Sequence, residues 1–204
     1  LNGDGVRDIL VGRVGDYGVR ELVIDYPRPE FSLVGDLGDA PDAADGTSPW
    51  DYNTQISDNG PLHGVSEGLR LGESVSIDES VNPSRAANSD DDDGVVNPAR
   101  DLYITGIPSI ELLVTNEDGV DAKLYGWIDV NFDGVFDESE RVFEDVPHGT
   151  NTVTLVFPEL PQGLAGQTYA RFRLSSDEAA ASPTGIARDG EVEDYLVGIN
   201  RPAG

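Results

Sequence analysis

Residues 129–140 carry oxygen-bearing side chains at alternate positions, followed by a glycine and, later, a glutamate. The segment reads Asp129-Val130-Asn131-Phe132-Asp133-Gly134-Val135-Phe136-Asp137-Glu138-Ser139-Glu140 and matches the pattern D-x-[DN]-x-[DN]-G-x5-E. In a curled loop, the oxygens at positions 1, 3 and 5 converge on one point, and glycine at position 6 permits the sharp turn. This spacing predicts a Ca²⁺ site, and the alternative is an acidic β-hairpin without metal. The expected ligands are Asp129, Asn131, Asp133, Val135 (through its carbonyl), Asp137 and Glu140.

A second acidic segment, Asp189-Gly190-Glu191-Val192-Glu193-Asp194-Tyr195, leads into an apolar run near the C-terminal end. Carboxylates this dense raise one another's pKa unless a cation lies among them. In a strand, Glu191 and Glu193 point to one side and Asp194 to the other. We therefore expect one side to serve a metal ion and the other to meet a neighbouring loop. Arg171 and Arg173 are candidate countercharges on a nearby strand.

Two more acidic clusters are candidate calcium sites. Four consecutive aspartates, Asp90, Asp91, Asp92 and Asp93, precede Gly94 and an apolar pair. A cation would relieve their mutual repulsion, and the alternative is a solvated acidic loop. Near the start of the chain, Asn2, Asp4 and Asp8 resemble the same calcium loop with its first position missing. A plain Asn-Gly-Asp-Gly turn explains these last residues equally well.

The segment 35–68 is poor in strand patterns and rich in Gly, Pro, Asp and Asn. A loop of this length inside a compact domain is unusual and often functional, and it needs something to order it. Asp36, Asp39 and Asp42, at intervals of three, suit a coiled loop that binds metal. We expect a ligand-contact surface from Trp50, Asp51, Tyr52, Asn53 and His63. The alternative is that the aromatic residues only anchor the loop.

Patterns for catalysis are weak. Gly64-Val65-Ser66-Glu67-Gly68 fits G-x-S-x-G, but that signature needs a strand, a tight turn and a helix, and no helical pattern follows. The chain has 2 histidines and no cysteine, so it lacks a cysteine nucleophile. A pair of glycosidase carboxylates stays open because acids are abundant. We expect binding rather than enzymatic activity.

The net charge of the chain limits the classes of molecule that it can bind. Its 204 residues include 13 Lys and Arg against 39 Asp and Glu, which gives a net charge of −26. Such a chain repels nucleic acid and anionic membrane surfaces, so we expect neither nucleic-acid binding nor membrane insertion. The absence of cysteine fits a large extracellular module that uses calcium where small ones use disulfides. We expect a secreted or cell-surface piece of a longer multidomain chain.

The elements that must position these residues are strands. Apolar residues alternate with others in 110–114, 122–130, 153–157 and 169–174, which is the period of half-buried strands. With turn residues between them, these segments predict an all-β fold, an antiparallel β-sandwich with long calcium-ordered loops and very little helix. The one helical candidate lies around 177–181. Residues 31–200 form the expected calcium-binding domain, and residues 1–30 are either a linker with a calcium-loop remnant or its first strand.

Five motifs occur in an order that resembles a known family. In chain order they are the segment 36–42, the Asp-Gly-Val segment after Asp90, the segment 126–134, Tyr169-Ala170-Arg171-Phe172-Arg173, and Gly190-Glu191-Val192-Glu193-Asp194-Tyr195. The series resembles the GEVED domain of bacterial secreted and surface proteins. It is also similar to a calcium-dependent peptide-binding domain of repeats-in-toxin adhesins. This resemblance implies several Ca²⁺ ions and, as partner, a protein C-terminus on a target cell whose terminal carboxylate meets calcium.

Three functions are therefore distinguished. A binding module of a bacterial surface adhesin predicts a calcium ion with an open coordination position near 35–68. A structural spacer predicts that protein ligands close every calcium site. A carbohydrate-binding accessory domain of a secreted hydrolase predicts glycan ligands and a catalytic module elsewhere in the parent chain. The long aromatic-bearing loop favours the first.

Overall fold

The structure is a computed structural model that describes residues 10–12, 20–22, 35–75, 83–88, 93–161 and 163–200. The chain divides into two compact units, residues 1–32 and 33–204. In the first unit, β1 (Leu10–Gly12) pairs antiparallel with β2 (Arg20–Leu22). Every candidate site residue that the structure describes lies in the second unit.

The second unit is built around a five-stranded sheet with the order β6-β13-β11-β8-β9. Its strands are β6 (Tyr103–Ile104), β8 (Ala122–Ile128), β9 (Arg141–Val146), β11 (Gly166–Ser175) and β13 (Glu191–Ile199). β6 runs parallel to β13, and the other neighbours are antiparallel. The pairing of β11 with β13 runs from Gly166↔Ile199 to Leu174↔Glu191, so residues 191–195 of the acidic segment pair with β11, whereas β6 pairs with β13 only at Gly198 and Ile199.

One face of this sheet packs against a three-stranded sheet, β10-β7-β5, and forms a sandwich. The second sheet contains β5 (Leu69–Leu71), β7 (Ser109–Asn116) and β10 (Thr152–Val156). Alternate residues of β7 are buried, as the period of two predicted. The shared core includes Ile110, Leu112, Leu155, Phe172 and Leu174, all with 0% exposure. Burial of this apolar surface is the main driving force of the fold.

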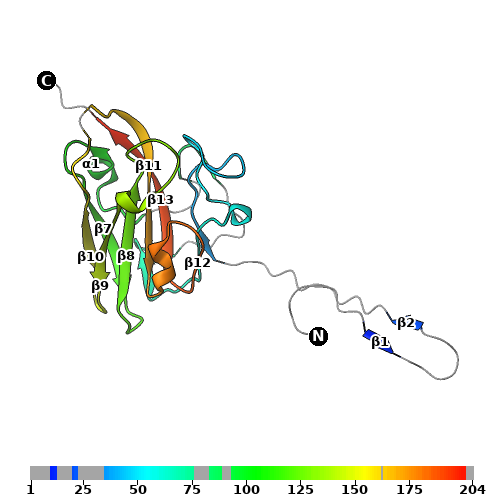
Figure 1. The fold of residues 1–204 in the computed structure, drawn as a ribbon. Helices are drawn as coiled ribbons and strands as arrows, with labels where there is room; N and C mark the ends of the chain where they lie inside the picture. The colour runs from blue at the N-terminus through cyan, green and yellow to red at the C-terminus, as the bar shows by residue number, and fades with distance from the viewer. Residues whose placement is uncertain are drawn as a thin grey trace. The chain divides into compact units, whose positions relative to one another are not determined.

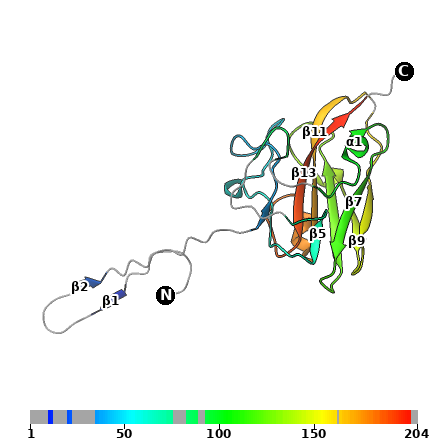
Figure 2. The same ribbon diagram turned by 180° about the vertical axis from the view of Figure 1, so that it is seen from behind.

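The opposite face of the five-stranded sheet is covered by what we call the loop layer, residues 35–64 and 176–190. In Figures 1 and 2 the blue and cyan loops lie on the side of β11 and β13 away from β7 and β10. The layer contains the small sheet β12-β4-β3. Its elements are β3 (Asp36–Leu37), β4 (Leu62–His63), β12 (Ile186–Ala187) and the 3₁₀ helices η1 (Ile56–Asp58) and η3 (Glu178–Ala181).

The predicted fold class is confirmed, because the described residues are mostly strands with very little helix. The remaining elements are the single-turn helix α1 (Pro98–Asp101) and the 3₁₀ helix η2 (Glu138–Glu140). The helix expected around 177–181 is η3. Within the described ranges, no helix is long and apolar enough to cross a membrane.

Candidate functional site: an acidic strand and a calcium-type loop

The acids of β13 on the sandwich face accept hydrogen bonds from backbone N–H groups. Glu191 Oε2 accepts from the Leu71 N–H at 2.7 Å. Glu193 Oε1 accepts from the N–H groups of Asp93 and Gly94 at 3.1 and 2.9 Å. The Tyr195 hydroxyl donates to Glu193 Oε2 at 3.0 Å. These carboxylates therefore join β13 to β5 and to the segment that follows Asp93.

Burial makes one of these acids hard to ionise. Burial, with a smaller contribution from the Glu191 carboxylate, raises the pKa of Glu193 to about 8. The donated hydrogen bonds oppose this shift without cancelling it. Two acidic side chains thus share a buried position where a positive charge would stabilise the ionised form.

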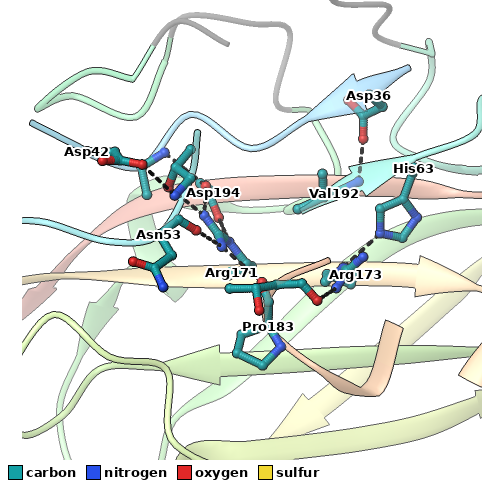
Figure 3. Close-up of polar contacts among 12 residues, drawn as sticks. Asp36, Asp42, Asn53, His63, Arg171, Arg173, Pro183, Val192 and Asp194 are labelled. Carbon is teal, nitrogen blue, oxygen red and sulfur yellow. Dashed lines mark hydrogen bonds and ion pairs between the residues drawn. The ribbon is translucent and has the colours of Figure 1, made fainter. Parts of the chain in front are cut away.

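On the opposite face, Asp194 forms a buried ion pair with Arg171 (Figure 3). Both side chains have 0% exposure. Asp194 Oδ1 and Oδ2 accept from Arg171 Nε at 2.7 Å and from Nη2 at 2.8 Å, the two-point geometry that makes such pairs strong. Asp194 Oδ2 also accepts from the Ala40 N–H at 2.9 Å. The strand and the loop layer are therefore joined by a fully desolvated charge pair.

The remaining donors of Arg171 bind the loop layer. Nη2 donates to Thr54 Oγ1 at 2.9 Å, and Nη1 donates to the carbonyls of Asn53 and Pro183 at 3.2 and 2.9 Å. Asp42, a predicted metal ligand, accepts from the N–H groups of Thr54 and Gln55 at 2.8 and 2.6 Å. Arg171 therefore holds two separate parts of the layer on one strand, as Figure 3 shows.

Arg173, the other predicted countercharge, contacts a histidine instead of an acid. Its Nε donates to His63 Nε2 at 2.8 Å, and its other nitrogens donate to the carbonyls of Ser182, Thr184 and Gly185. His63 Nδ1 lies 2.8 Å from the Asp189 carbonyl, so the neutral tautomer with a proton on Nδ1 satisfies both ring nitrogens. Burial and the Arg173 charge hold the pKa of His63 well below its usual value.

The three aspartates predicted to form a metal-binding coil take separate roles. Asp36 Oδ2 accepts from the Val192 N–H, whereas Asp42 binds residues 54 and 55. Asp39 is buried, and its carbonyl accepts from the Ser84 N–H at 2.9 Å. The spacing of three residues predicted one coiled metal-binding loop, whereas the hydrogen bonds of Asp36, Asp39 and Asp42 lead to different parts of the fold.

The loop 129–140 curls in the manner its spacing predicts. Asp129, which has 0% exposure, accepts from the N–H groups of Phe132 and Gly134 at 2.6 and 3.0 Å. Asn131 Oδ1 accepts from the Asp133 N–H, and Asp133 Oδ1 from the Val135 N–H, at 3.0 and 2.9 Å. Gly134 has φ +84°, the left-handed conformation that the sixth position requires.

The last predicted ligand closes the loop. Glu140 Oε1 and Oε2 accept from the N–H groups of Val130 and Asp137 at 2.8 and 3.0 Å. Asp137 and Glu140 also form the capping box of η2. Burial raises the pKa of Glu140 to about 7. Both ends of the loop are thus tied together through one carboxylate, at a position where a cation would favour its ionised form.

The turn 48–52 lies directly on this loop. The Tyr52 hydroxyl donates to Asp129 Oδ2 at 2.6 Å, and the Tyr52 ring stacks on Phe136 with a centroid distance of 4.8 Å. A Cβ at position 134 would lie 1.9 Å from the Ser48 carbonyl oxygen, so the close approach needs glycine. The predicted calcium loop and the turn 48–52 of the predicted ligand-contact surface are therefore in direct contact.

Within that turn, Trp50 is held at the surface. Its side chain is exposed to 39%, and its φ of +71° is unusual for a residue with a bulky side chain. The Trp50 ring packs edge-on against Tyr169 with a centroid distance of 5.9 Å, and the Arg85 guanidinium carbon lies 5.8 Å from its centre. Backbone hydrogen bonds in both directions between Ser48 and Asp51 fix the turn. Strained positions of this kind persist only where their surroundings enforce them.

Comparison with known proteins assigns a family to the region that contains the acidic strand β13 and the loop 129–140. Residues 123–198 match the family model of the GEVED domain. The match runs from β8 to β13 and includes the loop 129–140, so it confirms the predicted GEVED resemblance for this part of the chain. No curated protein and no solved structure matches the chain.

The predicted calcium ligands of the loop 129–140 are all oxygen atoms. Among the residues that the structure describes, no three His, Asp or Glu side chains converge as a metal site. The donor set of the loop is nevertheless mixed, because it adds the Asn131 amide oxygen and the Val135 carbonyl to carboxylates, and hard oxygen ligands suit Ca²⁺. A carboxylate has about four acceptor positions, and the hydrogen bonds from Tyr52, Phe132 and Gly134 to Asp129 use three. The loop therefore fits the ion by its chemistry and its curl.

The remaining predicted calcium ligands lie outside the loop 129–140. Asp90, Asp91, Asp92, Asn2, Asp4 and Asp8 lie outside the described residues. Asp93 is exposed and accepts from the Glu73 N–H.

Of the expected ligand-contact residues, Tyr52 and His63 are buried and form hydrogen bonds inside the domain. Asp51 accepts from the Ala43 N–H at 2.6 Å, and the Asn53 carbonyl binds Arg171. Trp50 is the member of this set that stays exposed.

The G-x-S-x-G segment does not form a nucleophile elbow. Ser66 Oγ donates to Asp118 Oδ2 at 2.6 Å. A turn at 67–68 and then strand β5 follow it, instead of the helix that a nucleophile elbow requires.

Proposed function

We propose that this chain is a calcium-dependent ligand-binding module of a bacterial surface adhesin. The observation that carries the proposal is the 2.6 Å hydrogen bond from the Tyr52 hydroxyl to Asp129 Oδ2. It joins Asp129, the first position of the loop 129–140, to the turn that presents Trp50. We call the loop 129–140 the calcium-type loop. Any ion that fixes the loop therefore also fixes the exposed aromatic surface.

The proposal assigns definite tasks to the residues of the loop. Asp129, Asn131, Asp133, the Val135 carbonyl, Asp137 and Glu140 would hold the ion. When bound, Ca²⁺ supplies a positive charge that stabilises the ionised acids and a coordination position for a ligand oxygen. Asp129 orients Tyr52, Gly134 lets the turn approach, and Trp50 offers an aromatic face to the ligand. The ligand class proposed is a peptide or protein C-terminus on a target cell, with its carboxylate directed to calcium.

The proposed extracellular location rests on composition and family. The net charge of −26 and the lack of cysteine suit a module that is stabilised by calcium outside the cell. The GEVED match supports the assignment to a surface protein through the resemblance described above. The partner is proposed to be protein, since a chain of this charge is repelled by nucleic acid and by anionic membranes.

Calcium itself is tested by thermal unfolding. We expect excess EDTA to lower the melting temperature, because an ion that binds only the native state stabilises it by about 2.7 kcal/mol at 100 times its Kd. Asp133→Ala should remove most of this calcium effect. Asp45→Ala is the matched control, since Asp45 is an exposed aspartate outside the loop. Identical melting curves with calcium and with EDTA would overturn the proposal.

The ligand class is tested with short peptides that differ at their ends. Peptides with a free terminal carboxylate should bind in calcium and not in EDTA, and the same peptides with an amidated end should bind in neither. Trp50→Ala should weaken binding while the calcium-dependent melting shift remains. Equal binding of free and amidated peptides would remove the carboxylate from the proposal.

One observation favours a second function, a structural spacer. The described acids of β13 already accept hydrogen bonds from the chain itself, as do Asp42 and Glu140. Such closed sites stabilise a fold without offering a position to a ligand. A large calcium-dependent melting shift with no binding to any peptide or glycan of an array would support the spacer.

A further inference from the structure

A groove lies beside the edge strand β6, and no residue of the loop 129–140 lines it. It has a volume of about 350 Å³ and is lined by residues of α1, β6 and the turn 105–109. Two of its side chains are large, apolar and exposed: Tyr103 to 64% and Ile107 to 61%. Isolated apolar residues at a surface are ordinary, but here they flank a concave site that also contains charged groups.

The walls of this groove are fixed by backbone hydrogen bonds. The Gly198 N–H donates to the Leu102 carbonyl at 2.8 Å, and the Asn200 N–H to the Ile104 carbonyl at 3.0 Å. The turn on the other side is held by bonds from Leu160 and Phe157 to the carbonyls of Gly106 and Pro108. The Tyr103 ring lies over Gly198, where an added Cβ would come within 3.3 Å of it. The aromatic ring is therefore positioned before any ligand arrives.

The groove contains a buried carboxylate with an unused oxygen. The Asp101 side chain is exposed to only 3%, and its Oδ1 pairs with Arg100 Nε. Its Oδ2 is buried and has no hydrogen-bond partner in the structure. Leaving a buried acceptor without a donor is costly, and such an atom calls for an explanation. A hydroxyl or N–H group of a ligand entering the groove would supply the missing donor.

The neighbouring side chains restrict what that ligand is. The Arg100 side chain, exposed to 67%, stands beside Asp101 with free N–H donors. A cationic ligand would meet this guanidinium, and an anion would meet the carboxylate. A neutral polyhydroxyl ring can donate to Asp101 Oδ2 and accept from Arg100 at the same time. Its C–H face can pack on Tyr103, whose ring is apolar with a polar tip.

From this combination we propose that the groove formed by Asp101, Arg100, Tyr103 and Ile107 is a binding subsite for a neutral pyranose sugar. It is separate from the calcium-dependent site and contains none of its ligands. The fixed ring, the exposed guanidinium and the unpartnered oxygen give the small number of convergent polar groups and the apolar wall that small-molecule sites share.

The test is a chemical-shift titration of the whole chain with methyl α-mannopyranoside, methyl β-glucopyranoside and lactose. Each sugar is added to about 10 mM, roughly tenfold above a Kd of about 1 mM. At least one sugar should shift the amide signals of residues 101–109. Tyr103→Ala should weaken this binding by about tenfold or more, and Asp101→Asn should also weaken it. Phe143→Ala is the matched control, because Phe143 is exposed to 53% on the opposite edge strand β9, and it should leave binding unchanged.

Two further arms keep the outcome decisive. The titration is repeated in EDTA at a temperature where circular dichroism shows a folded chain, and the subsite should still bind sugar even if the calcium proposal fails. Arginine methyl ester serves as the cationic probe and should not shift these signals. No shift with any of the three sugars, an unchanged Kd in the Tyr103→Ala variant, or preferential binding of the cationic probe would each overturn the proposal.

Discussion

The two faces of the five-stranded sheet are built from alternate residues of the same strands, yet they are stabilised differently. On β11, Ala170, Phe172 and Leu174 enter the apolar sandwich core, whereas Arg171 and Arg173 are buried on the other face. The sandwich face meets a second sheet whose backbone groups pair in ladders. The other face meets a loop layer with few such ladders. Since buried backbone polar groups need partners, side chains have to supply them there.

The charged residues perform this task on the loop side. Carboxylates of Asp194 and Asp42 accept from backbone N–H groups, and the two guanidinium groups donate to backbone carbonyls. A buried ion pair contributes little net stability compared with apolar packing, but removing one partner leaves an uncompensated buried charge. The loop side therefore depends on complete satisfaction of its polar groups, and the sandwich side depends on packing.

The largest effect is expected from breaking this polar network. Asp194→Ala leaves Arg171 buried without its countercharge and should lower the free energy of unfolding by about 3–5 kcal/mol. Asp145→Ala, which breaks an exposed pair with Lys123, should cost no more than about 1 kcal/mol. Urea unfolding measures both. If the two variants lost equal stability, the loop side would not depend on its buried charges.

The sequence predicted the sandwich side better than the loop side. Alternation in residues 110–114 and 153–157 identified β7 and β10, because one face of each strand meets an apolar core. The same period placed Glu191 and Glu193 opposite Asp194, as the structure has them. It also marked Arg171 and Arg173 as countercharges, although Arg173 binds His63. That partner could not be predicted, since the contact joins residues 110 positions apart through a loop without periodicity.

In the calcium-type loop too, the local structure could be predicted from the sequence and the long-range contact could not. Its curl followed from Gly134 and from the alternate oxygen-bearing residues, which are local features. Its contact with the turn 48–52 depends on Tyr52, 77 residues away from Asp129. Tyr52 was predicted as a surface contact, but its hydroxyl is needed inside the domain. An aromatic residue in a loop gives no sign in the sequence of which end will be buried.

A smaller effect is expected from substituting two glycines. The pair separates the cost of a left-handed backbone from the cost of a clash with the turn 48–52. Gly134 and Gly149 have φ of +84° and +86°, but an added Cβ meets the Ser48 carbonyl at position 134 and nothing within 4 Å at position 149. Gly149→Ala should cost about 1–2 kcal/mol for the left-handed backbone alone. Gly134→Ala should cost about 1–3 kcal/mol more, because the turn 48–52 must move.

Urea unfolding gives the two costs, and tryptophan fluorescence reports the turn. The Gly134→Ala variant should shift the emission of Trp50, whereas Gly149→Ala should not. Equal costs for the two variants would mean that the turn does not rest on the loop. The link between the calcium-type loop and the exposed aromatic surface would then lose its support.

A last effect concerns the acids at the margin of the sandwich face, and it appears as pH dependence. The pKa of Glu193 is about 8 in the folded chain, against an ordinary value of 4.5. Between these two values the native state holds a proton that the unfolded state has released. Stability therefore decreases as pH rises from about 4.5 to about 8. Glu140, with a pKa of about 7, contributes in the same direction over a narrower range.

Glu193→Gln removes the titrating group and should reduce this decline, while Glu140 keeps part of it. Melting temperatures at pH 5 and pH 8 in EDTA measure the difference between variant and wild type. A decline of equal size in both would place the titration elsewhere. A smaller decline in the variant would show that the sandwich face, although built mainly by packing, includes one margin where buried carboxylates need a proton or a cation. It would then share with the loop side the requirement that every buried charge has a partner.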